Sequence, residues 1–503
     1  MNSIVFFRVI VNGIRQERSI FVRRFGYRVF QAEWLTVIIF AVLMMIEILH
    51  PPTIGLANNG DYDRLMALVG LHYPPQDTYY YQRYDHYYVP TFVMGFFGHG
   101  FYPSSALLPI AVAWVINAAV HFGTFDTQVL FFIYLALLCY GLYWIVRGLR
   151  QSFSYVAAIS VGAMSVLVLT EVGYAAYLPT LYSEPSSMVF WVLLLGLLFR
   201  FMLYPHAWWS RRLVWLCAAF FVTAKVQNAP LVLTVLAGLW GIFYRTYNVY
   251  DKRRFVRLAS WLVLCAIVVM VLNPPSFIMQ NTYDSFFTGL MVVAKPTDHL
   301  LRWFHLSGKL AILRNCSYFS APSLAWQSRL VASGFYHKVS MTRIIWFYLL
   351  HPWDIWHGLQ ISQLAAYVMR PNYLGNFAWI EHKGAGAMAQ RFDLWRSIRS
   401  TLPKNLWFWV MFSLVFLGTC LAFLRKPLPQ VRAVAFLSLM VFLVALLQFP
   451  IPFVGEGQNE LVKHLFLYDI LFDSVLVTAV GFVCHFVWSV VHGRFVAATR
   501  QMD

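Results

Sequence analysis

Residues 126–146 read DTQVLFFIYLALLCYGLYWIV, and only the first of them carries a charge. A helix needs roughly 20 apolar residues to cross about 30 Å of hydrocarbon, so this stretch predicts a transmembrane helix. The same character runs through the whole chain of 503 residues, of which 60% are hydrophobic and 12% are charged. Soluble proteins carry about 25% charged residues, so a soluble enzyme, a disordered chain and a fibrous repeat are excluded. The predicted class is an all-α polytopic membrane protein.

About ten stretches are long and apolar enough to span a bilayer. They are residues 32–50, 126–146, 153–170, 187–204, 213–229, 230–244, 258–274, 405–424, 431–450 and 467–490. Two further apolar stretches, 104–121 and 341–363, are expected to form helices that lie in the outer membrane–water interface. The first adjoins a span, and charged residues and histidines interrupt the second.

Basic residues set the predicted orientation of the chain. Arginines crowd the segment before the first span, which places the N-terminus in the cytoplasm because Lys and Arg are retained on that side. With ten spans, the other basic connections and the C-terminus also face the cytoplasm. The net charge of +17 is thereby explained by topology, and no nucleic-acid partner is expected. We also expect no cleavable signal peptide, because residues 32–50 form too long an apolar stretch and lack a small-residue cleavage site.

The spans divide the chain into five predicted parts. These are a basic cytoplasmic segment (1–31), a transmembrane module (32–274) with its first outer loop at 51–103, a long outer helical segment (275–403), C-terminal transmembrane helices (404–493) and a cytoplasmic tail (494–503). Loops as long as 51–103 and 275–403 are usually functional or disordered. Both are rich in aromatic residues and poor in Gly and Ser, which disfavours disorder. The chemistry is therefore expected on the outer side.

The sharpest local motif is NNGDYDR at residues 58–64, directly after the first span. Gly60 permits a tight turn that aims the carboxylate of Asp61 back towards the membrane. The alternative is an Asx-turn and helix cap that starts an interfacial helix near Arg64. The two interpretations are compatible, because a capping loop can also position a catalytic base.

A second carboxylate is expected at a similar depth. Glu184 lies in the element Tyr-Ser-Glu-Pro at 182–185, where the proline fixes the start of the fourth span. A first-turn glutamate often only complements the helix dipole. Two carboxylates from separate outer loops nevertheless favour a site over two independent caps.

Basic residues are placed at the same level. Lys225 stands between two apolar spans, where an ammonium either lines a cavity, finds a partner or extends to the interface. Lys463 and His464 end a polar stretch before the last span, and they suit a lipid phosphate unless that stretch is merely a solvated turn. Asp469 and Asp473 follow on one helical face, where they either pair with Lys225 or Lys463 or line a polar cavity, and pairing is favoured.

An aromatic run, YYYQRYDHYY at residues 79–88, completes the outer features. An aromatic belt at the headgroup level explains much of it, and a platform for stacking sugar rings is the alternative. The chain has no phosphate-binding P-loop, dinucleotide fingerprint, zinc-ligand spacing or nucleophile elbow. Any reaction must therefore draw on a membrane-borne donor or on a gradient.

Together these features resemble the GT-C superfamily of integral-membrane glycosyltransferases, and within it the bacterial hexosyltransferases of surface-glycan assembly. The resemblance rests on the Asn-Gly-Asp loop, the acid that opens the fourth span, Lys225 in the reversal between the fifth and sixth spans, a Tyr-X-Ser-X-Phe-X-Gly element at 283–289, and the Lys-His pair before the last span. One departure is that the loop holds two aspartates, Asp61 and Asp63, so which one is catalytic stays open.

The resemblance implies a GT-C-like bundle in the bacterial inner membrane with a periplasmic active site. The implied donor is a polyprenyl-phosphate-linked sugar and the implied acceptor a glycan or lipid-linked saccharide, with membrane lipids around the bundle. It implies that Asp61 is the general base and that Glu184 orients the acceptor or supports the base. The implied substrate-binding residues are Asn59, Asp63, Arg64, Tyr182, Lys225, Gln227, Tyr283, Glu456, Lys463 and His464.

No cofactor is implied with certainty. A divalent cation is compatible with the number of acids, but no metal ligands are assigned. Two other functions remain open at this stage. A transporter or flippase of a lipid-linked substrate would place its ionisable groups near the bilayer midplane. An O-antigen-type polymerase would use arginines of the long outer segment.

Overall fold

The computed structural model describes residues 31–74, 84–95, 98, 102–319, 328 and 331–500, the last nine by their backbone alone. The basic segment 1–30, the first part of the aromatic run (79–83) and residues 501–503 lie outside these ranges. Helices dominate the described part, and its one sheet has three short strands.

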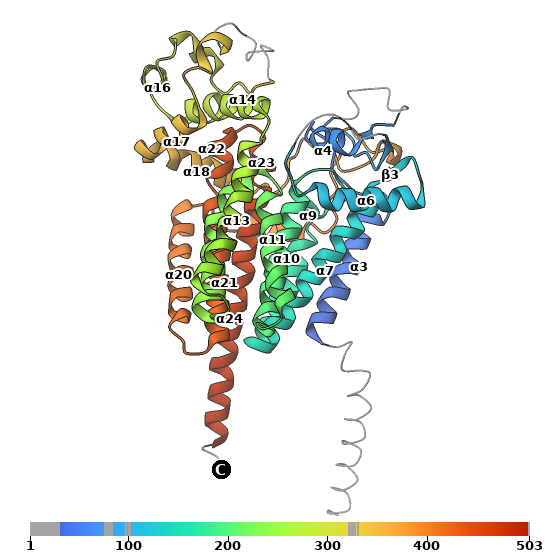
Figure 1. Cartoon of the computed structure of the whole chain (residues 1–503), viewed down its shortest axis with the longest axis vertical. Coiled ribbons are helices and arrows are strands. Elements are labelled where there is room, and N and C mark those ends of the chain that lie inside the picture. The colour runs from blue at the N-terminus through green and yellow to red at the C-terminus, as the bar shows by residue number, and fades with distance from the viewer. Residues whose placement is uncertain are drawn as a thin grey trace, which may run out of the picture.

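Each of the ten predicted spans coincides with a helix of one bundle (Figure 1). Within the described ranges, eight helices are long and apolar enough to cross a membrane. They are α3 (Ala32–Leu49), α7 (Thr127–Ser152), α10 (Glu184–Leu203), Val226–Thr246 with α12 (Val232–Leu239), α13 (Lys252–Val271), α20 (Leu406–Leu424), Pro429–Glu456 with α21 (Pro429–Gln448) and α22 (Ile451–Glu456), and α24 (Phe466–Arg500). The prediction of an all-α polytopic membrane protein is confirmed.

Two of the ten helices are shorter than the others. They are α8 (Tyr155–Leu169) and α11 (Trp208–Thr223). Both belong to the bundle, because α8 packs against α3, α7 and α24, and α11 packs against α10 and α13. The end of the bundle that carries α4, α6 and α14–α18 is called the outer end below, following the predicted orientation.

The central helix is α10, which is buried along almost its whole length. It meets α7 at two glycines: a Cβ on Gly196 would lie 2.4 Å from the carbonyl oxygen of Gly141. Small residues let helix backbones approach directly in a membrane, where packing rather than the hydrophobic effect drives association. This contact fixes α10 against α7, and with it the position of Glu184 at the outer end of α10.

The break between the fifth and sixth predicted spans lies earlier than expected. The sequence placed it at 229/230, before Pro230, but α11 ends at Thr223 and the backbone is extended at Lys225 (φ −145°, ψ 145°). Pro230 is instead accommodated in a 3-10 helix, Val226–Leu231. The side-chain amide of Asn228 donates to the carbonyl of Phe221 at 3.0 Å and so satisfies a free acceptor at the end of α11. Lys225 therefore stands in the gap itself.

One part of the outer end is built from the first outer loop. It contains α4 (Tyr62–Val69), α6 (Leu107–Val120) and an antiparallel sheet of β1 (Leu71–His72), β2 (Thr91–Met94) and β3 (Thr124–Asp126). Helix α6 lies across the bundle axis (Figure 1). It exposes Leu108, Val112 and Val115 and buries Ile110. This arrangement agrees with the predicted interfacial helix at 104–121.

The other part, called the outer module below, has its own apolar core. It comprises α14 (Pro275–Asp284), the π-helical turn Ser285–Leu290, α15 (Met291–Val293), α16 (Thr297–Trp303), α17 (Met341–Leu350) and α18 (Pro352–Ala366). Its core is aromatic, and the Phe286 ring contacts both Phe304 and Phe335. Helix α17 exposes Trp346 and Leu349, as expected for an interfacial helix at 341–363.

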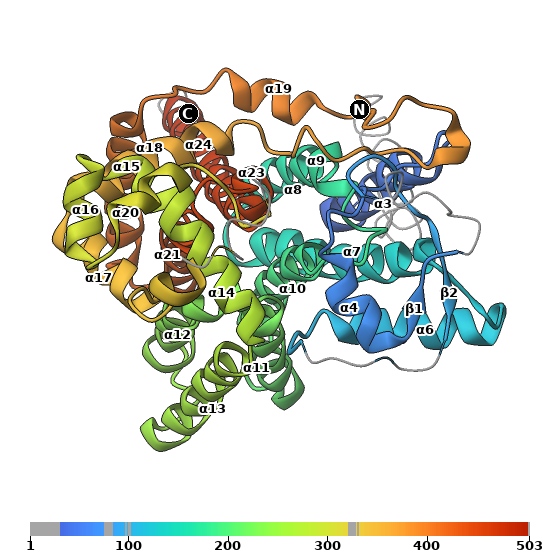
Figure 2. The same ribbon diagram turned by 90° about the horizontal axis from the view of Figure 1, so that it is seen from above.

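Residues 367–403 return from the outer module across the outer end to the first loop, and carry α19 (Leu394–Ser400) on the way (Figure 2). The Arg391 guanidinium donates to the carbonyls of His50 at 2.9 Å and Pro52 at 2.7 Å. The Asn376 amide donates to the carbonyl of Gly55 at 2.8 Å. This return segment therefore ties the two outer parts together.

Candidate functional site

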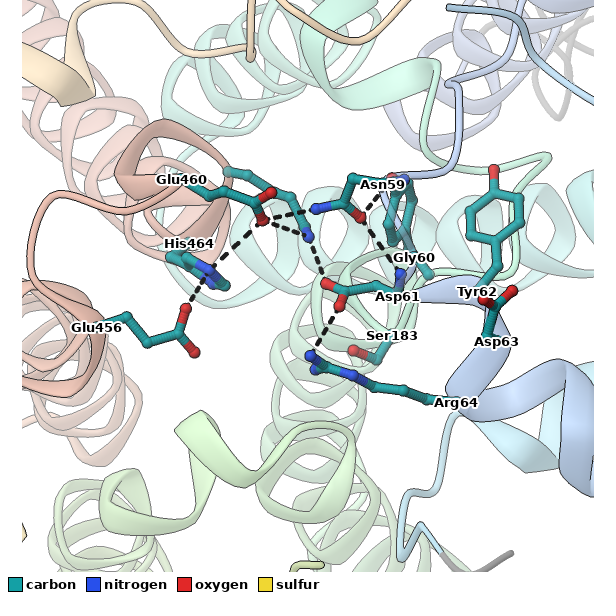
Figure 3. Close-up of polar contacts among 12 residues, drawn as sticks. Asn59, Gly60, Asp61, Tyr62, Asp63, Arg64, Ser183, Glu456, Glu460 and His464 are labelled. Carbon is teal, nitrogen blue, oxygen red and sulfur yellow. Dashed lines mark hydrogen bonds and ion pairs between the residues drawn. The ribbon is translucent and has the colours of Figure 1, made fainter. Parts of the chain in front are cut away.

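Charged side chains from four distant parts of the chain meet at the outer end of the bundle. They come from the 58–64 loop, the start of α10, the gap before Val226, and the stretch from α22 through α23 (Leu461–His464). Figure 3 shows those of the 58–64 loop and of the 456–464 stretch. The group, called the charge cluster below, consists of Asp61, Arg64, Glu184, Lys225, Glu456, Glu460, Lys463 and His464.

The loop that presents Asp61 is held by Asn58. The Asn58 side-chain oxygen accepts from the backbone N–H groups of Gly60 at 2.8 Å and Tyr62 at 3.0 Å. Gly60 has φ +105°, a conformation that only glycine adopts readily. The Tyr182 hydroxyl donates to the carbonyl of Ala57 at 2.7 Å and so fixes the loop to the start of α10. The cap of α4 is thus supplied by Asn58, and the carboxylate of Asp61 makes no capping bond.

Asp61 is bound by two cations. One carboxylate oxygen lies 2.8 Å from the Arg64 guanidinium, and the other accepts from the Lys463 ammonium. Its side chain is 15% exposed. Burial alone would raise the pKa of Asp61, but the Arg64 and Lys463 cations outweigh it and hold that pKa well below its ordinary value. In this state Asp61 is an ionised but weakly basic carboxylate.

Asp63 lies on the other side of the loop, away from Glu460 and His464 (Figure 3). Its carboxylate accepts from the Tyr84 hydroxyl at 2.7 Å and from the Asn58 amide at 3.4 Å. Of the two aspartates that the sequence left undecided, the structure brings Asp61 to the charge cluster and Asp63 to Tyr84, further along the first outer loop. Asp63 is therefore not a member of the charge cluster.

Glu184 and Lys225 form a buried ion pair, with 2.8 Å between the carboxylate oxygen and the ammonium nitrogen. The Lys225 nitrogen also lies 3.5 Å from Nδ1 of His464. The Gln227 amide donates to the backbone carbonyl of His464 at 2.9 Å. The gap after α11 therefore joins the start of α10 to α23.

Lys463 and His464 are each paired with a glutamate. Lys463, whose side chain is fully buried, donates to Glu460 at 3.1 Å in addition to Asp61. His464 contacts the carboxylate of Glu456 through Nε2. Surrounding acids, Asp61 first, outweigh the effect of burial and raise the pKa of Lys463 well above its ordinary value, so this lysine is a permanent cation.

Glu460 is the member of the charge cluster that was not assigned a role from the sequence. Its carboxylate accepts from the Asn59 amide at 2.6 Å as well as from Lys463. Its backbone is left-handed (φ +47°), which is uncommon outside glycine and is kept only where surrounding contacts require it. The spacing of three and four residues before Lys463 and His464 was the available signal, because such residues share a helical face.

A partly open cavity of about 130 Å³ adjoins the charge cluster. Its polar lining includes Arg64, Lys225, Gln227, Glu456 and His464, and its apolar lining comes largely from α14 and α22. The Arg64 guanidinium lies 4.3 Å from the centre of the Phe277 ring on α14. The lining thus combines cations and a histidine with apolar groups. Such a lining suits an amphipathic anion.

The model of one protein family, the YfdI N-terminal transmembrane domain, matches residues 18–496. The chain belongs to this family. No curated protein and no solved structure matches it. Membership of the YfdI family supports a multi-pass membrane protein, and its description names no reaction.

Tyr283 of this YfdI-family chain does not lie where the sequence suggested. Tyr283 is fully buried among Phe287, Tyr318 and Phe335 in the outer module, because α14 runs into a π-helical turn that directs the ring into that core. Its predicted substrate contact is therefore not supported by its position.

Among the described residues, no group of three His, Cys, Asp or Glu side chains is arranged to hold a metal ion.

The predicted pairing of Asp469 and Asp473 with a cluster lysine is wrong. Both bind Arg399 of α19, at 2.5 Å and 3.3 Å. The Asp473 carboxylate also accepts from the Tyr174 hydroxyl at 2.6 Å and from the Trp395 ring N–H at 2.7 Å. These aspartates therefore anchor the return segment to α24 of the YfdI-family bundle, one to two turns below the charge cluster.

Proposed function

We propose that the chain is a GT-C-type glycosyltransferase that moves a sugar from a polyprenyl-phosphate-linked donor to a glycan or lipid-linked acceptor at the outer face of the bacterial inner membrane. The observation that carries the proposal is the contact of Asp61 with two cations beside the cavity that Lys225 and His464 line. A proton acceptor thus stands next to a site suited to a lipid phosphate.

The donor phosphate would occupy the cavity against Arg64, Lys225 and His464. In the charge cluster four carboxylates (Asp61, Glu184, Glu456 and Glu460) face three permanent cations, so a phosphate can bind only by taking cations from these acids. Arg64 and Lys225 each pair with an acid and line the cavity, and Arg64 is the one whose partner is Asp61. The departure of Arg64 would relieve the lowered pKa of Asp61 and make that carboxylate a better base. Donor binding and activation of the base are thereby coupled.

In the reaction, Asp61 would take the proton of the acceptor hydroxyl as its oxygen attacks the anomeric carbon of the donor sugar. The bond from that carbon to the phosphate oxygen breaks, and the electron pair leaves with polyprenyl phosphate. Lys225, Arg64 and His464 would stabilise the added negative charge. A general base contributes roughly 10²–10⁴-fold, and preorganised cations contribute a further few kcal/mol of the barrier. Attack from the side opposite the phosphate inverts the anomeric carbon.

Membranes that contain the Asp61→Asn variant, incubated with radiolabelled polyprenyl-phosphate sugars and acceptor glycan, test the proposal. We expect donor binding to be retained and transfer to fall at least 10²-fold. Asp63→Asn is the matched control, because Asp63 lies in the same loop but bonds to Tyr84; it should keep activity within a fewfold. Full transfer by Asp61→Asn would remove Asp61 as the base. Donor movement across the bilayer without transfer would point to a flippase, and a ladder of extended products to a polymerase.

The arginines of the long outer segment favour the transferase over the polymerase. Arg399 binds two buried aspartates, and Arg391 binds backbone carbonyls. Arg396 pairs with Asp393, and Arg370 donates to the carbonyl of Ala389. These four side chains hold the return segment in place, and none of them lines the cavity beside the charge cluster.

A further inference from the structure

A second charged hollow lies at the opposite end of the bundle from the charge cluster. It has a volume of about 280 Å³ and is lined by Trp208, Arg211, Arg212, Tyr250 and Arg254. Helix α11 starts at Trp208 and α13 at Lys252, and the two helices pack side by side (Figure 2). The 16 residues of α11 place this hollow roughly 24 Å from the gap that holds Lys225. It is therefore separate from the proposed active site.

The three guanidinium groups of the hollow are held over aromatic rings. Arg212 lies 4.2 Å from the ring centre of Trp208. Arg211 and Arg254 lie 5.8 Å and 5.2 Å from the ring centre of Tyr250. Cation–π contacts orient guanidinium groups but leave their charge in place. The result is a fixed arrangement of three positive charges around one space.

No carboxylate forms an ion pair with these guanidinium groups within the described ranges. None of the three arginines forms an ion pair there, although Asp251 is close in sequence. The Asp251 carboxylate instead accepts from the backbone N–H of Arg254 at 2.6 Å, as the cap of α13. Arg211 donates to the carbonyl of Val249 at 3.5 Å. One nearby carboxylate leaves three neighbouring guanidinium groups with a net positive charge, and an anion in the hollow would relieve their mutual repulsion.

The walls of the hollow continue into apolar surface. Trp208 is 43% exposed, and Leu216, two turns further along the same face of α11, is also 43% exposed. Val256 on α13 is exposed to a similar degree. Tryptophan favours the boundary between headgroups and hydrocarbon. The hollow therefore stands at headgroup level, with acyl-chain surface directly beyond it.

We propose that this hollow binds the phosphate headgroup of an anionic phospholipid of the inner leaflet, with its acyl chains against Leu216 and Val256. Guanidinium groups bind phosphate oxygens through paired N–H donors, and basic pockets between transmembrane helices on the cytoplasmic side take anionic headgroups. A free phosphate ion shares the headgroup chemistry. It would make no use of the apolar flanks.

Native mass spectrometry of the delipidated full chain, titrated with phosphatidylglycerol or phosphatidylcholine, tests this site. We expect saturable binding of phosphatidylglycerol to the wild-type chain at concentrations where phosphatidylcholine binds weakly. Each guanidinium removed should weaken binding by about fivefold, and the variant with Arg211, Arg212 and Arg254 all changed to Gln by roughly a hundredfold. Arg212→Gln alone, on an exposed side chain, provides a variant that keeps the fold if the triple change does not.

The matched control changes Arg245, Lys252 and Arg253 to Gln, which removes the same charge from the same end of the bundle outside the hollow. It should weaken phosphatidylglycerol binding less than threefold. Equal losses in the two triple variants, or equal binding of the two lipids by the wild type, would overturn the proposal. Glycerol 3-phosphate and inorganic phosphate form the second arm: if either displaces phosphatidylglycerol at equal concentration, the site takes a soluble anion and the lipid assignment fails.

Discussion

Replacement of Lys463 by methionine is the perturbation that most directly probes the charge cluster. The change removes a fully buried ammonium that binds Asp61 and Glu460 and leaves an apolar side chain of similar length. Removing one partner of a buried ion pair costs roughly 3–5 kcal/mol. Asp61 keeps Arg64 at 2.8 Å and Glu460 keeps Asn59 at 2.6 Å, so we expect the lower end of that range. The entropy of unfolding grows with chain length. In a chain of this size, a loss of about 3 kcal/mol in the free energy of unfolding therefore lowers the melting temperature by only about 3 °C.

A double-mutant cycle separates the ion pair from a general effect on packing. Asp61→Asn, Lys463→Met and the double variant are melted in detergent at pH 7, where both groups are charged. Because cations lower the pKa of Asp61 in the folded state, its stabilising contribution is complete above about pH 4 and is lost only as the pH falls further. The double variant should be more stable than the sum of the single effects by about 1–3 kcal/mol.

The matched control cycle pairs Lys463→Met with Asp63→Asn. Asp63 bonds to Tyr84 and lies on the other side of the loop, so these two effects should add within about 0.5 kcal/mol. Additivity in the Asp61 cycle would refute the contact on which the proposed site depends. Strong coupling in the Asp63 cycle would show that Lys463 acts on the whole loop rather than on Asp61.

Three further changes test other parts of the structure. Gly60→Ala forces an alanine to φ +105°, so it should lower stability by roughly 1–3 kcal/mol and reduce transfer by misplacing Asp61; melting and transfer assays on one preparation check both. Burial raises the pKa of Asp284 to about 8, so the folded state holds a proton that the unfolded state releases, and this carboxyl lowers stability by up to about 1.4 kcal/mol per pH unit between its ordinary pKa and pH 8. The melting temperature of Asp284→Asn should therefore exceed that of the wild type by more at pH 8 than at pH 5. A difference that does not change with pH would contradict this. Arg399→Met leaves Asp469 and Asp473 without their cation and should destabilise the chain by roughly 3–5 kcal/mol, whereas adding Asp469→Asn and Asp473→Asn should restore part of the loss, as yield and melting in detergent would show.

The helices were predictable because a bilayer imposes a simple rule of length and apolarity. That rule found all ten bundle helices, and the two shorter apolar stretches are helical as well, although the second is divided into α17 and α18. The rule failed at the end of α11, because residues 213–229 are apolar enough to be taken as one continuous span. The chain instead opens at Lys225, where Asn228 satisfies a helix carbonyl that no sequence pattern reveals.

The candidate site was predictable in part, for a different reason. Asp61, Glu184 and Lys225 stand out because charges are rare next to apolar spans. Partner choice was not predictable, since it depends on how distant segments cross. Asp469 pairs with Arg399, which lies 70 residues earlier in the return segment, and not with the nearer Lys463.

The return segment is held at two places: Arg391 binds the carbonyls after α3, and Arg399 of α19 binds Asp469 and Asp473 of α24. The return segment thus connects, across the outer end, the loop that carries Asp61 to the part of the bundle that carries Lys463. An outward movement of the outer module would therefore have to hinge about the return segment or break its contacts with α24 and with the residues after α3.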